Sequence, residues 1–373
     1  MNFSITKESF TQLLYLTNTI VEKKNTMPIL ANVKLSADQN KLCISATDLE
    51  TSLIGAAEAT VKIPGSITVD AKVLYDIIRE LPDQPITVIL SKKQRLDIEC
   101  AQSRFRINGI AADEFPTING VTLGNPVSVD AGMLFEMLEK TAFAVSTDET
   151  RHNINGVFVE TAEGSLGPGK KCLRMVATDG HRLAMIDRPA DGLEFKEPVI
   201  IPRKGIQELK KVLESNEGAA QVSIGEGFFT LRSGETTMGV RLVDGQFPDY
   251  KQVIPLDNST TIEVDRAELL SAIKRVSLVT TDKTKAVKFK LVAGDLLISS
   301  SSPEYGEASE TLTVQQNGDD VTIGFSSKYL IDLLSAMTRS ESISVRLSGE
   351  LGPGVFRGSE DELYNCIVMP MRF

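Results

Sequence analysis

The chain has few of the side chains on which metal and catalytic sites depend. It contains no tryptophan, and only two of its 373 residues are histidines. Its four cysteines are Cys43, Cys100, Cys172 and Cys366. Because none is close in sequence to another and no H-E-x-x-H motif occurs, the sequence predicts no metal site and no cofactor. We expect the cysteines to be small buried side chains in a reducing compartment.

Long apolar runs are also absent. No stretch approaches the roughly 18 apolar residues that a membrane-spanning helix needs. The N-terminus, MNFSITKESF, lacks the basic region and apolar core of a signal peptide. We therefore expect a cytoplasmic protein without a membrane partner. Since 42% of the residues are apolar but only 6% are aromatic, the cores must be built mainly from aliphatic side chains.

The net charge of −10 argues against a simple nucleic-acid binder, although it says nothing of how the charge is distributed. Apolar periodicity predicts six helices, at 7–18, 70–80, 131–145, 203–214, 265–277 and 326–339. These segments hold 13 basic and 11 acidic residues, so they are basic relative to the rest of the chain. Two interpretations remain: solvated helix faces, or a spread-out surface for nucleic-acid phosphates.

The sequence repeats itself three times. A short alternating strand that leads into helical spacing occurs as FSITKESFTQLL from Phe3, VSVDAGMLFEML from Val127 and IEVDRAELLSAI from Ile262. A second shared pattern, K-x-[LI]-x-[DE]-[IL], begins at Lys72, Lys204 and Lys328. The repeated unit of about 120 to 135 residues is too long for a solenoid repeat. We therefore predict three homologous domains, at 1–125, 126–258 and 259–373.

Each predicted domain combines two helices with many short alternating strands. Such strands are typical of antiparallel sheets with one face on the core. Two helices that cover one side of these sheets form an α+β arrangement, in which the outer helix faces share one surface.

The segment GSLGPGKK, 164–171, nearly matches a phosphate-binding loop. Its last position is Lys171 instead of serine or threonine, and strands are predicted on both sides, so we predict no nucleotide site there. His181 follows Asp179 by two residues, which leaves an enzyme of unknown chemistry as one alternative, although neighbouring turn residues need not face each other.

Longer motifs carry a specific resemblance. They are MPIL from Met27, ATDLE from Ala46, VATDGHRLAM from Val176, IPRKG from Ile201, LVDGQFPDYKQVIP from Leu242 and VMPMRF at the end. In this order, and with the threefold repeat, the chain resembles the bacterial beta sliding clamps of DNA polymerase over its whole length.

The resemblance implies a DNA-clamp fold in which each chain forms half of a ring. In this family a head-to-tail homodimer encircles duplex DNA and slides along it. The ring tethers the DNA polymerase catalytic subunit and other replication and repair proteins that carry clamp-binding peptides. A separate clamp-loader ATPase opens it. The resemblance therefore implies that the chain is not an enzyme. A second alternative is a scaffold that binds peptides but no DNA.

The resemblance also implies a peptide pocket between the second and third domains for short segments with leucine, phenylalanine and glutamine. Its matching positions are Ile154, Thr178, Gly180, His181, Arg182, Leu183, Pro248, Gln252, Val253, Ser326, Tyr329, Leu351, Pro353, Ile367, Met369, Pro370, Met371 and Arg372. Methionine side chains adapt to different ligands, which suits several partners. Read from the residues alone, the C-terminus is a docked last strand and 178–183 is a turn.

Two further surfaces follow from the same matching. The DNA contacts would be Lys24, Lys72, Arg151, His152, Asn153, Arg203 and Lys204. The family often has an aromatic pair at positions 152 and 153, and a longer polar group at Gln252, so this chain differs there. The dimer interface would contain Arg104, Phe105, Ile107, Leu278, Val279, Glu304 and Glu307, with apolar packing at the centre and charge pairs at the rim.

Overall fold

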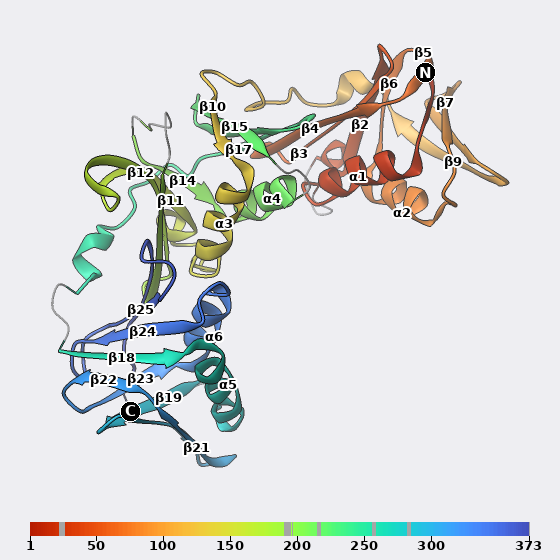
Figure 1. The fold of residues 1–373 in the computed structure, drawn as a ribbon. Coiled ribbons are helices and arrows are strands. Elements are labelled where there is room, and N and C mark those ends of the chain that lie inside the picture. Colours follow the sequence, from red (N-terminus) through yellow and green to blue (C-terminus); the bar gives the residue numbers. More distant parts are fainter. Residues whose placement is uncertain are drawn as a thin grey trace. The chain divides into compact units, whose positions relative to one another are not determined.

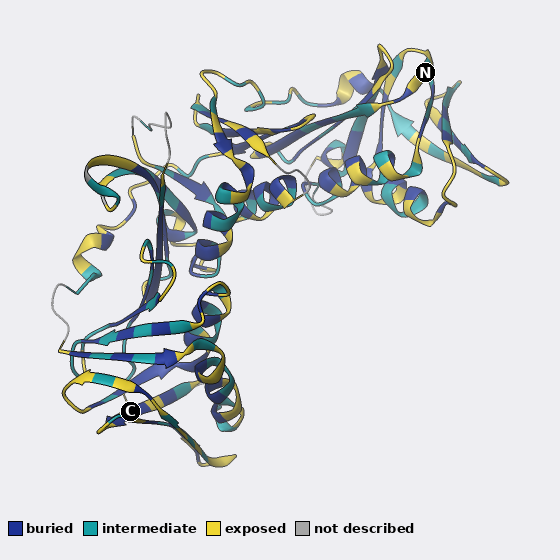
Figure 2. Cartoon of the chain, in the orientation of Figure 1, coloured by how far each residue is buried: buried dark blue, intermediate teal, exposed yellow. Residues whose placement is uncertain are grey.

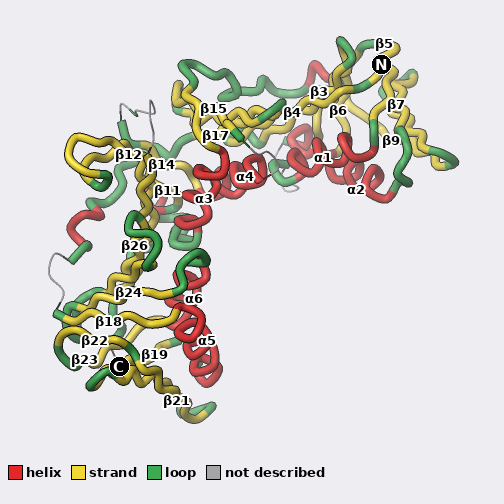
Figure 3. Tube along the Cα trace, viewed as in Figure 1, coloured by secondary structure: helices red, strands yellow, loops and turns green. Residues whose placement is uncertain are grey.

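The computed structural model describes residues 1–21, 27–189, 195, 197–214, 218–255, 259–281 and 285–372. The described residues form six α-helices and many short strands, which Figure 3 shows in red and yellow. The helices are α1 (Lys7–Asn18), α2 (Ala71–Glu80), α3 (Ala131–Ala142), α4 (Arg203–Glu214), α5 (Arg266–Val276) and α6 (Ser327–Ala336). The predicted helices agree with these bounds to within three residues at every end.

Short polar side chains begin four of the helices. Thr6 accepts a hydrogen bond from the Ser9 amide at the start of α1. Asp70, Asp130 and Asp265 accept from the amides three residues later, at 2.8, 2.7 and 2.8 Å, at the starts of α2, α3 and α5. Each carboxylate satisfies an amide that has no partner within its helix and lies at the positive end of the helix dipole. The repeated strand-to-helix junctions therefore follow from local chemistry.

The chain forms two compact units, of which the first comprises Met1–Phe135 and Lys204–Leu242. Its described strands form an antiparallel sheet of 13 strands. In sheet order they are β10 (Val127–Asp130), β15 (Ala219–Gly225), β16 (Phe228–Ser233), β17 (Thr236–Arg241), β4 (Thr51–Glu58), β3 (Lys41–Thr47), β2 (Asn32–Asp38), β6 (Gly65–Asp70), β9 (Ser103–Ile110), β8 (Arg95–Cys100), β7 (Ile86–Ser91), β1 (Asn2–Ile5) and β5 (Thr60–Ile63). Helices α1 and α2 cover one face of it (Figure 1).

The second unit comprises Glu136–Arg203 and Val243–Phe373. Its nine-stranded sheet runs β14 (Val199–Pro202), β11 (Gly156–Gly164), β12 (Gly167–Thr178), β13 (Arg182–Pro189), β26 (Tyr364–Val368), β25 (Gly354–Gly358), β24 (Ser342–Leu347), β18 (Thr260–Asp265) and β22 (Gln315–Gly318). A four-stranded sheet runs β21 (Gly306–Thr313), β20 (Asp295–Ser302), β19 (Ala286–Val292) and β23 (Val321–Ser326). Every pairing in both sheets is antiparallel, which confirms the predicted α+β class.

The cores are aliphatic, as the composition predicts. Figure 2 shows buried residues along the strands and on one side of each helix. In α1, Phe10 and Leu14 are fully buried, whereas Tyr15 is exposed. Three cysteines are buried and Cys43 is partly buried, and all four are free thiols. Burial raises the pKa of the Cys366 thiol to about 12, so this group stays protonated and unreactive.

A cluster of buried and partly buried charges lies in the second unit. The Lys140 ammonium lies 2.6 Å from Asp361 and 3.0 Å from Glu136. Arg188 pairs with the same two carboxylates, at 2.7 and 3.2 Å. Glu136 also pairs with Arg339 at 3.2 Å. Since each carboxylate is shared by at least two cations, no charge in this cluster lacks a partner.

Pairing across the repeats joins their strands into continuous sheets. β17 of the second repeat pairs with β4 of the first, and β13 of the second pairs with β26 of the third. The predicted boundaries after residues 125 and 258 remain a prediction. The next described strands, β10 and β18, begin at Val127 and Thr260.

Candidate functional site

A cavity of about 140 Å³ opens in the second unit. Four segments of chain build it: η3 (His152–Ile154), the turn between β12 and β13, the segment around η4 (Tyr250–Val253), and the end of β26. Its lining consists of Ile154, Thr178, Gly180, His181, Arg182, Leu183, Pro248, Asp249, Tyr250, Val253, Ile367 and Met369. Six of these twelve residues carry apolar side chains, and a few polar groups lie among them, which is typical of a ligand site.

The turn from Thr178 to Leu183 is held by its own side chains. The Asp179 carboxylate accepts from the amides of His181 and Arg182, at 2.9 and 3.1 Å. The Thr178 hydroxyl accepts from the Gly180 amide at 3.1 Å and donates to the Arg182 carbonyl at 2.6 Å. Gly180 has a φ of +92°, a conformation that side chains disfavour. The turn is therefore a defined wall of the cavity.

Arg182 is a buried cation behind this wall. Its guanidinium lies 3.0 Å from Asp179 and 2.6 Å from Asp332, and it donates to the Phe143 carbonyl at 2.5 Å. Its Cζ lies 4.5 Å from the ring centroid of Tyr329. Two carboxylates and an aromatic face thus compensate the burial of this charge.

The opposite wall is held through Tyr250. Its hydroxyl donates to Glu160 at 2.5 Å and accepts from Arg174 at 3.0 Å. Arg174 also makes two parallel hydrogen bonds to Asp187, both of 2.7 Å. Burial raises the pKa of Tyr250, so its phenol remains a neutral donor. Glu160, Arg174 and Asp187 lie in register on β11, β12 and β13.

The C-terminal residues form the edge of the cavity. Leu183 and Ile367 are paired on β13 and β26, and both are buried. Beyond β26, the Met369 amide donates to the His181 carbonyl at 2.9 Å, and the Met371 amide donates to the Gly324 carbonyl at 2.8 Å. The apolar segment 369–371 is therefore docked, and its Met369 also lines a cavity.

Ten of the predicted pocket residues line this cavity, and the others lie outside it. Those outside are Gln252, Ser326, Tyr329, Leu351, Pro353, Pro370, Met371 and Arg372. Gln252 donates to Asp249 at 3.0 Å, and Leu351 is 74% exposed. Sequence reasoning missed Asp249 and Tyr250, although both belong to the FPDYKQVIP motif that it singled out. The position of Tyr250 between Pro248 and Val253 could have predicted it as a pocket residue, because tyrosine combines an apolar ring with a polar hydroxyl group.

A second cavity, of about 370 Å³, shares His181 and Arg182 with the first. Arg151, Arg203 and Lys328 also line it. Two of the predicted DNA contacts are thus brought together with a lysine that the prediction omitted. Arg151 pairs with Asp148 at 3.0 Å. Within the described residues, the side chains of Arg203 and Lys328 make no ion pair.

The remaining predicted DNA contacts differ in their surroundings. Lys72 is half exposed and pairs with Asp76 at 2.9 Å. Lys204 pairs with the buried carboxylate of Asp48, and this ion pair compensates much of the lysine charge. His152 is exposed in η3, and the neighbouring Asn153 amide donates to the Gln246 carbonyl at 3.3 Å. Lys24 lies outside the described residues.

The predicted interface residues lie at two open sheet edges. Along Ser103–Asn108, β9 pairs only with β8 among the described strands, and β21 pairs only with β20. Phe105 on β9 is 40% exposed, and Leu278, which precedes β19, is 80% exposed. Ile107 and Val279 are partly exposed, while Arg104, Glu304 and Glu307 are exposed. Tyr305, which the prediction missed, is 60% exposed at the same end of β21.

The geometry of the described residues supports neither a nucleotide site at 164–171 nor a catalytic pair of Asp179 and His181. The segment 164–171 joins strands β11 and β12, as predicted, and no helix follows it. The Asp179 carboxylate is occupied by two amides and Arg182, whereas the His181 ring stacks on Tyr329 with centroids 6.4 Å apart. The described residues contain no cluster of three or more potential metal ligands. No described helix is long and apolar enough to cross a membrane.

Three repeats of two helices on antiparallel sheets, with open edges and an apolar cavity, define a protein of the DNA-clamp class. Family models of the DNA polymerase III beta subunit match the chain throughout: the N-terminal domain at 1–119, the central domain at 128–249 and the C-terminal domain at 251–372. The chain therefore belongs to the DNA polymerase III beta subunit family, the beta sliding clamps. It is a processivity factor of replication and not an enzyme.

Individual relatives are similar to this chain over its full length. The beta sliding clamp of Pseudomonas putida is 34% identical, with 100% of both chains covered. A crystal structure of the Caulobacter crescentus clamp has a TM-score of 0.94 at 32% identity and covers 100% of this chain and 99% of that chain. The Bartonella birtlesii clamp, solved bound to griselimycin, has a TM-score of 0.93 at 32% identity, with both chains fully covered.

Proposed function

We propose that two copies of the chain close head to tail into a ring that encircles duplex DNA. The two open edges carry this proposal. β9 presents Phe105 and Ile107 beside Arg104, while Leu278 and Tyr305 lie near the β21 edge with Glu304 and Glu307. Exposed strand edges invite pairing with another chain. One edge is basic and the other acidic at its rim, so unlike edges attract and like edges repel, which favours the head-to-tail arrangement.

The contact with DNA is topological and independent of sequence in this proposal. The cluster of Arg151, Arg203 and Lys328 would attract phosphates without reading bases. A few screened contacts allow sliding, whereas many strong ones would hold the ring in place. Lys72 contributes in the same way from α2.

The cavity of about 140 Å³ would bind short apolar peptides of the DNA polymerase catalytic subunit, of the clamp-loader ATPase, and of other replication and repair proteins. The griselimycin complex of the Bartonella birtlesii clamp supports a ligand site in this family. The lining supports this role, because Leu183, Val253, Ile367 and Met369 offer adaptable apolar contacts.

Retention on circular DNA tests the ring. After loading by a clamp loader, we expect the protein to stay on nicked circular DNA at high salt and to leave once the DNA is cut into a linear form. Only a topological link predicts this difference, since phosphate contacts are equal on both forms. Equal loss from circular and linear DNA would contradict encirclement and favour a scaffold that binds peptides alone.

A further inference from the structure

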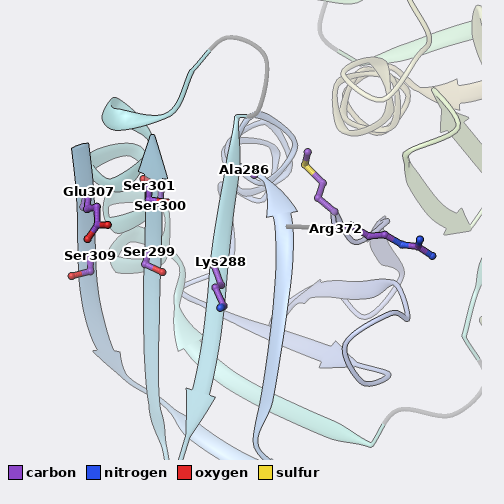
Figure 4. Close-up of a pocket in the computed structure, with 10 residues that line it drawn as sticks. Ala286, Lys288, Ser299, Ser300, Ser301, Glu307, Ser309 and Arg372 are labelled. Carbon is purple, nitrogen blue, oxygen red and sulfur yellow. The ribbon is translucent and has the colours of Figure 1, made fainter. Parts of the chain in front are cut away.

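A groove of about 580 Å³ lies on the solvent-exposed face of the four-stranded sheet (Figure 4). Its floor is formed by the short side chains of Ser299, Ser301 and Ser309. Lys288 on β19 and Glu307 on β21 are the longer groups beside them. Alternation explains this composition, because the intervening residues of these strands face the core.

Strand register arranges these groups in rows. Lys288 pairs with Ser299 on β20, and Ser299 pairs with Ser309 on β21. In the next row, Ser301 pairs with Glu307. Hydroxyl groups therefore fill the middle of the groove and can donate or accept hydrogen bonds. The lysine lies on the β19 side and the carboxylate on the β21 side.

The C-terminal segment is a wall shared with the apolar cavity. Met369 lines that cavity, whereas Met371 and Arg372 line the groove. The Met371 amide is bonded to the Gly324 carbonyl, and Gly324 pairs with Lys288. Two residues of extended chain span about 7 Å. A peptide that leaves the cavity along this segment therefore reaches the groove within a few residues.

Charge selects what the groove can accept. Arg372 lies on the C-terminal segment and Lys288 on β19, whereas Glu307 lies on β21 at the opposite side of the groove (Figure 4). An acidic side chain that enters from the cavity would meet the two cations first, while the serines would bond to the peptide backbone. Apolar side chains would gain little, since few apolar groups other than Met371 and two alanines line the groove.

We propose that this groove is a subsite for the residues that flank the apolar anchor of a partner peptide, and that it prefers acidic residues next to the anchor. The proposal rests on the peptide-binding function proposed for the cavity. It adds a source of discrimination among partners that share the same apolar anchor, because only the flanking residues would differ.

Binding of synthetic peptides to the full-length protein tests this subsite. The core peptide carries glutamine, leucine and phenylalanine, and it is flanked by three aspartates, three serines or three lysines at either its N- or its C-terminal end. At low salt we expect the aspartate flank, at one of the two ends, to bind about 3- to 10-fold more tightly than the serine flank. The lysine flank at that end should bind more weakly than the serine flank.

Variants assign the effect to the groove. Lys288→Ser should reduce the gain from aspartate and leave binding of the serine-flanked peptide unchanged. Lys290→Ser is the matched control, because Lys290 is exposed on the same strand but does not line the groove. It should preserve the gain.

Two results would overturn the proposal in distinguishable ways. If the core peptide binds but no flank at either end changes its affinity, or the gain is unchanged in Lys288→Ser, the groove is not a subsite and the cavity keeps its function. If the core peptide itself does not bind, the peptide-binding function fails and the subsite fails with it.

Discussion

The guanidinium carbon of Arg182 lies over the ring of Tyr329, 4.5 Å from the ring centroid. The arginine follows the turn that lines the apolar cavity, and the tyrosine belongs to α6. Asp179 and Asp332 complete the surroundings of the guanidinium. The cavity wall therefore depends on a compensated buried charge as well as on apolar packing.

Replacing Arg182 by methionine should destabilise the protein strongly. The apolar stem remains, but Asp179 and Asp332 lose their cation in a partly buried place. Such a loss costs about 3 to 5 kcal/mol in the free energy of unfolding. Denaturant unfolding followed by circular dichroism measures it. Arg95→Met, at an exposed position outside the predicted sites, is the control and should cost less than about 1 kcal/mol. Equal effects of the two variants would refute this role of Arg182.

Tyr250→Phe tests whether the cavity wall must be held in place by hydrogen bonds as well as being apolar. The ring remains, but the hydrogen bonds to Glu160 and Arg174 are lost, which should cost about 1 to 3 kcal/mol in the free energy of unfolding. Binding of the core peptide should weaken by a few-fold, because the wall is less fixed. Calorimetric titration well below the unfolding temperature measures this. Unchanged affinity would mean that the hydroxyl serves stability alone.

Tyr250 also contributes to the dependence of stability on alkaline pH. Its pKa in the folded protein is raised above the usual value of 10, mainly by burial. The unfolded chain therefore loses this proton first, so the contribution is complete below about pH 10 and declines above it. Tyr250→Phe should reduce the loss of stability above pH 10. An unchanged alkaline slope in urea unfolding would contradict this assignment.

The Lys140 cluster should make stability depend on acidic pH. Burial by itself would raise the pKa of Asp361, but hydrogen bonds from Arg188 and Lys140 outweigh it, so the pKa is lowered. The stabilisation is therefore present above the unfolded value of about 4 and is lost as pH falls further. Asp361→Asn should reduce stability at pH 7 and flatten the decline below pH 4. Asp113→Asn, at an exposed position, should leave both unchanged.

The open edges predict the state of assembly. Phe105→Ala together with Leu278→Ala should yield monomers where the unaltered chain forms dimers, because truncation of interface anchors usually costs a few kcal/mol. Light scattering across dilution gives the mass directly. Leu351→Ala removes an equally exposed leucine outside these edges and should not change the mass. Dimers that persist in the double variant would refute this placement of the interface.

The helices and the cavity show how far the sequence could lead. The helix starts were predictable because Asp70, Asp130 and Asp265 act on amides only three residues away. The cavity could be predicted only through resemblance. Leu183 and Ile367 are far apart in the sequence, and they become neighbours by strand pairing.

By itself, the sequence determined the threefold repeat, the helices and the α+β class with antiparallel sheets, since periodicity and capping are local. Tertiary structure decided what each repeated residue does. Lys72, Lys204 and Lys328 begin the same motif, yet the first pairs within its helix, the second pairs with the buried Asp48, and the third lines a cavity. The reason is physical: the effect of a charge depends on the partners near it, and for Lys204 the fold supplies Asp48 from a distant part of the sequence.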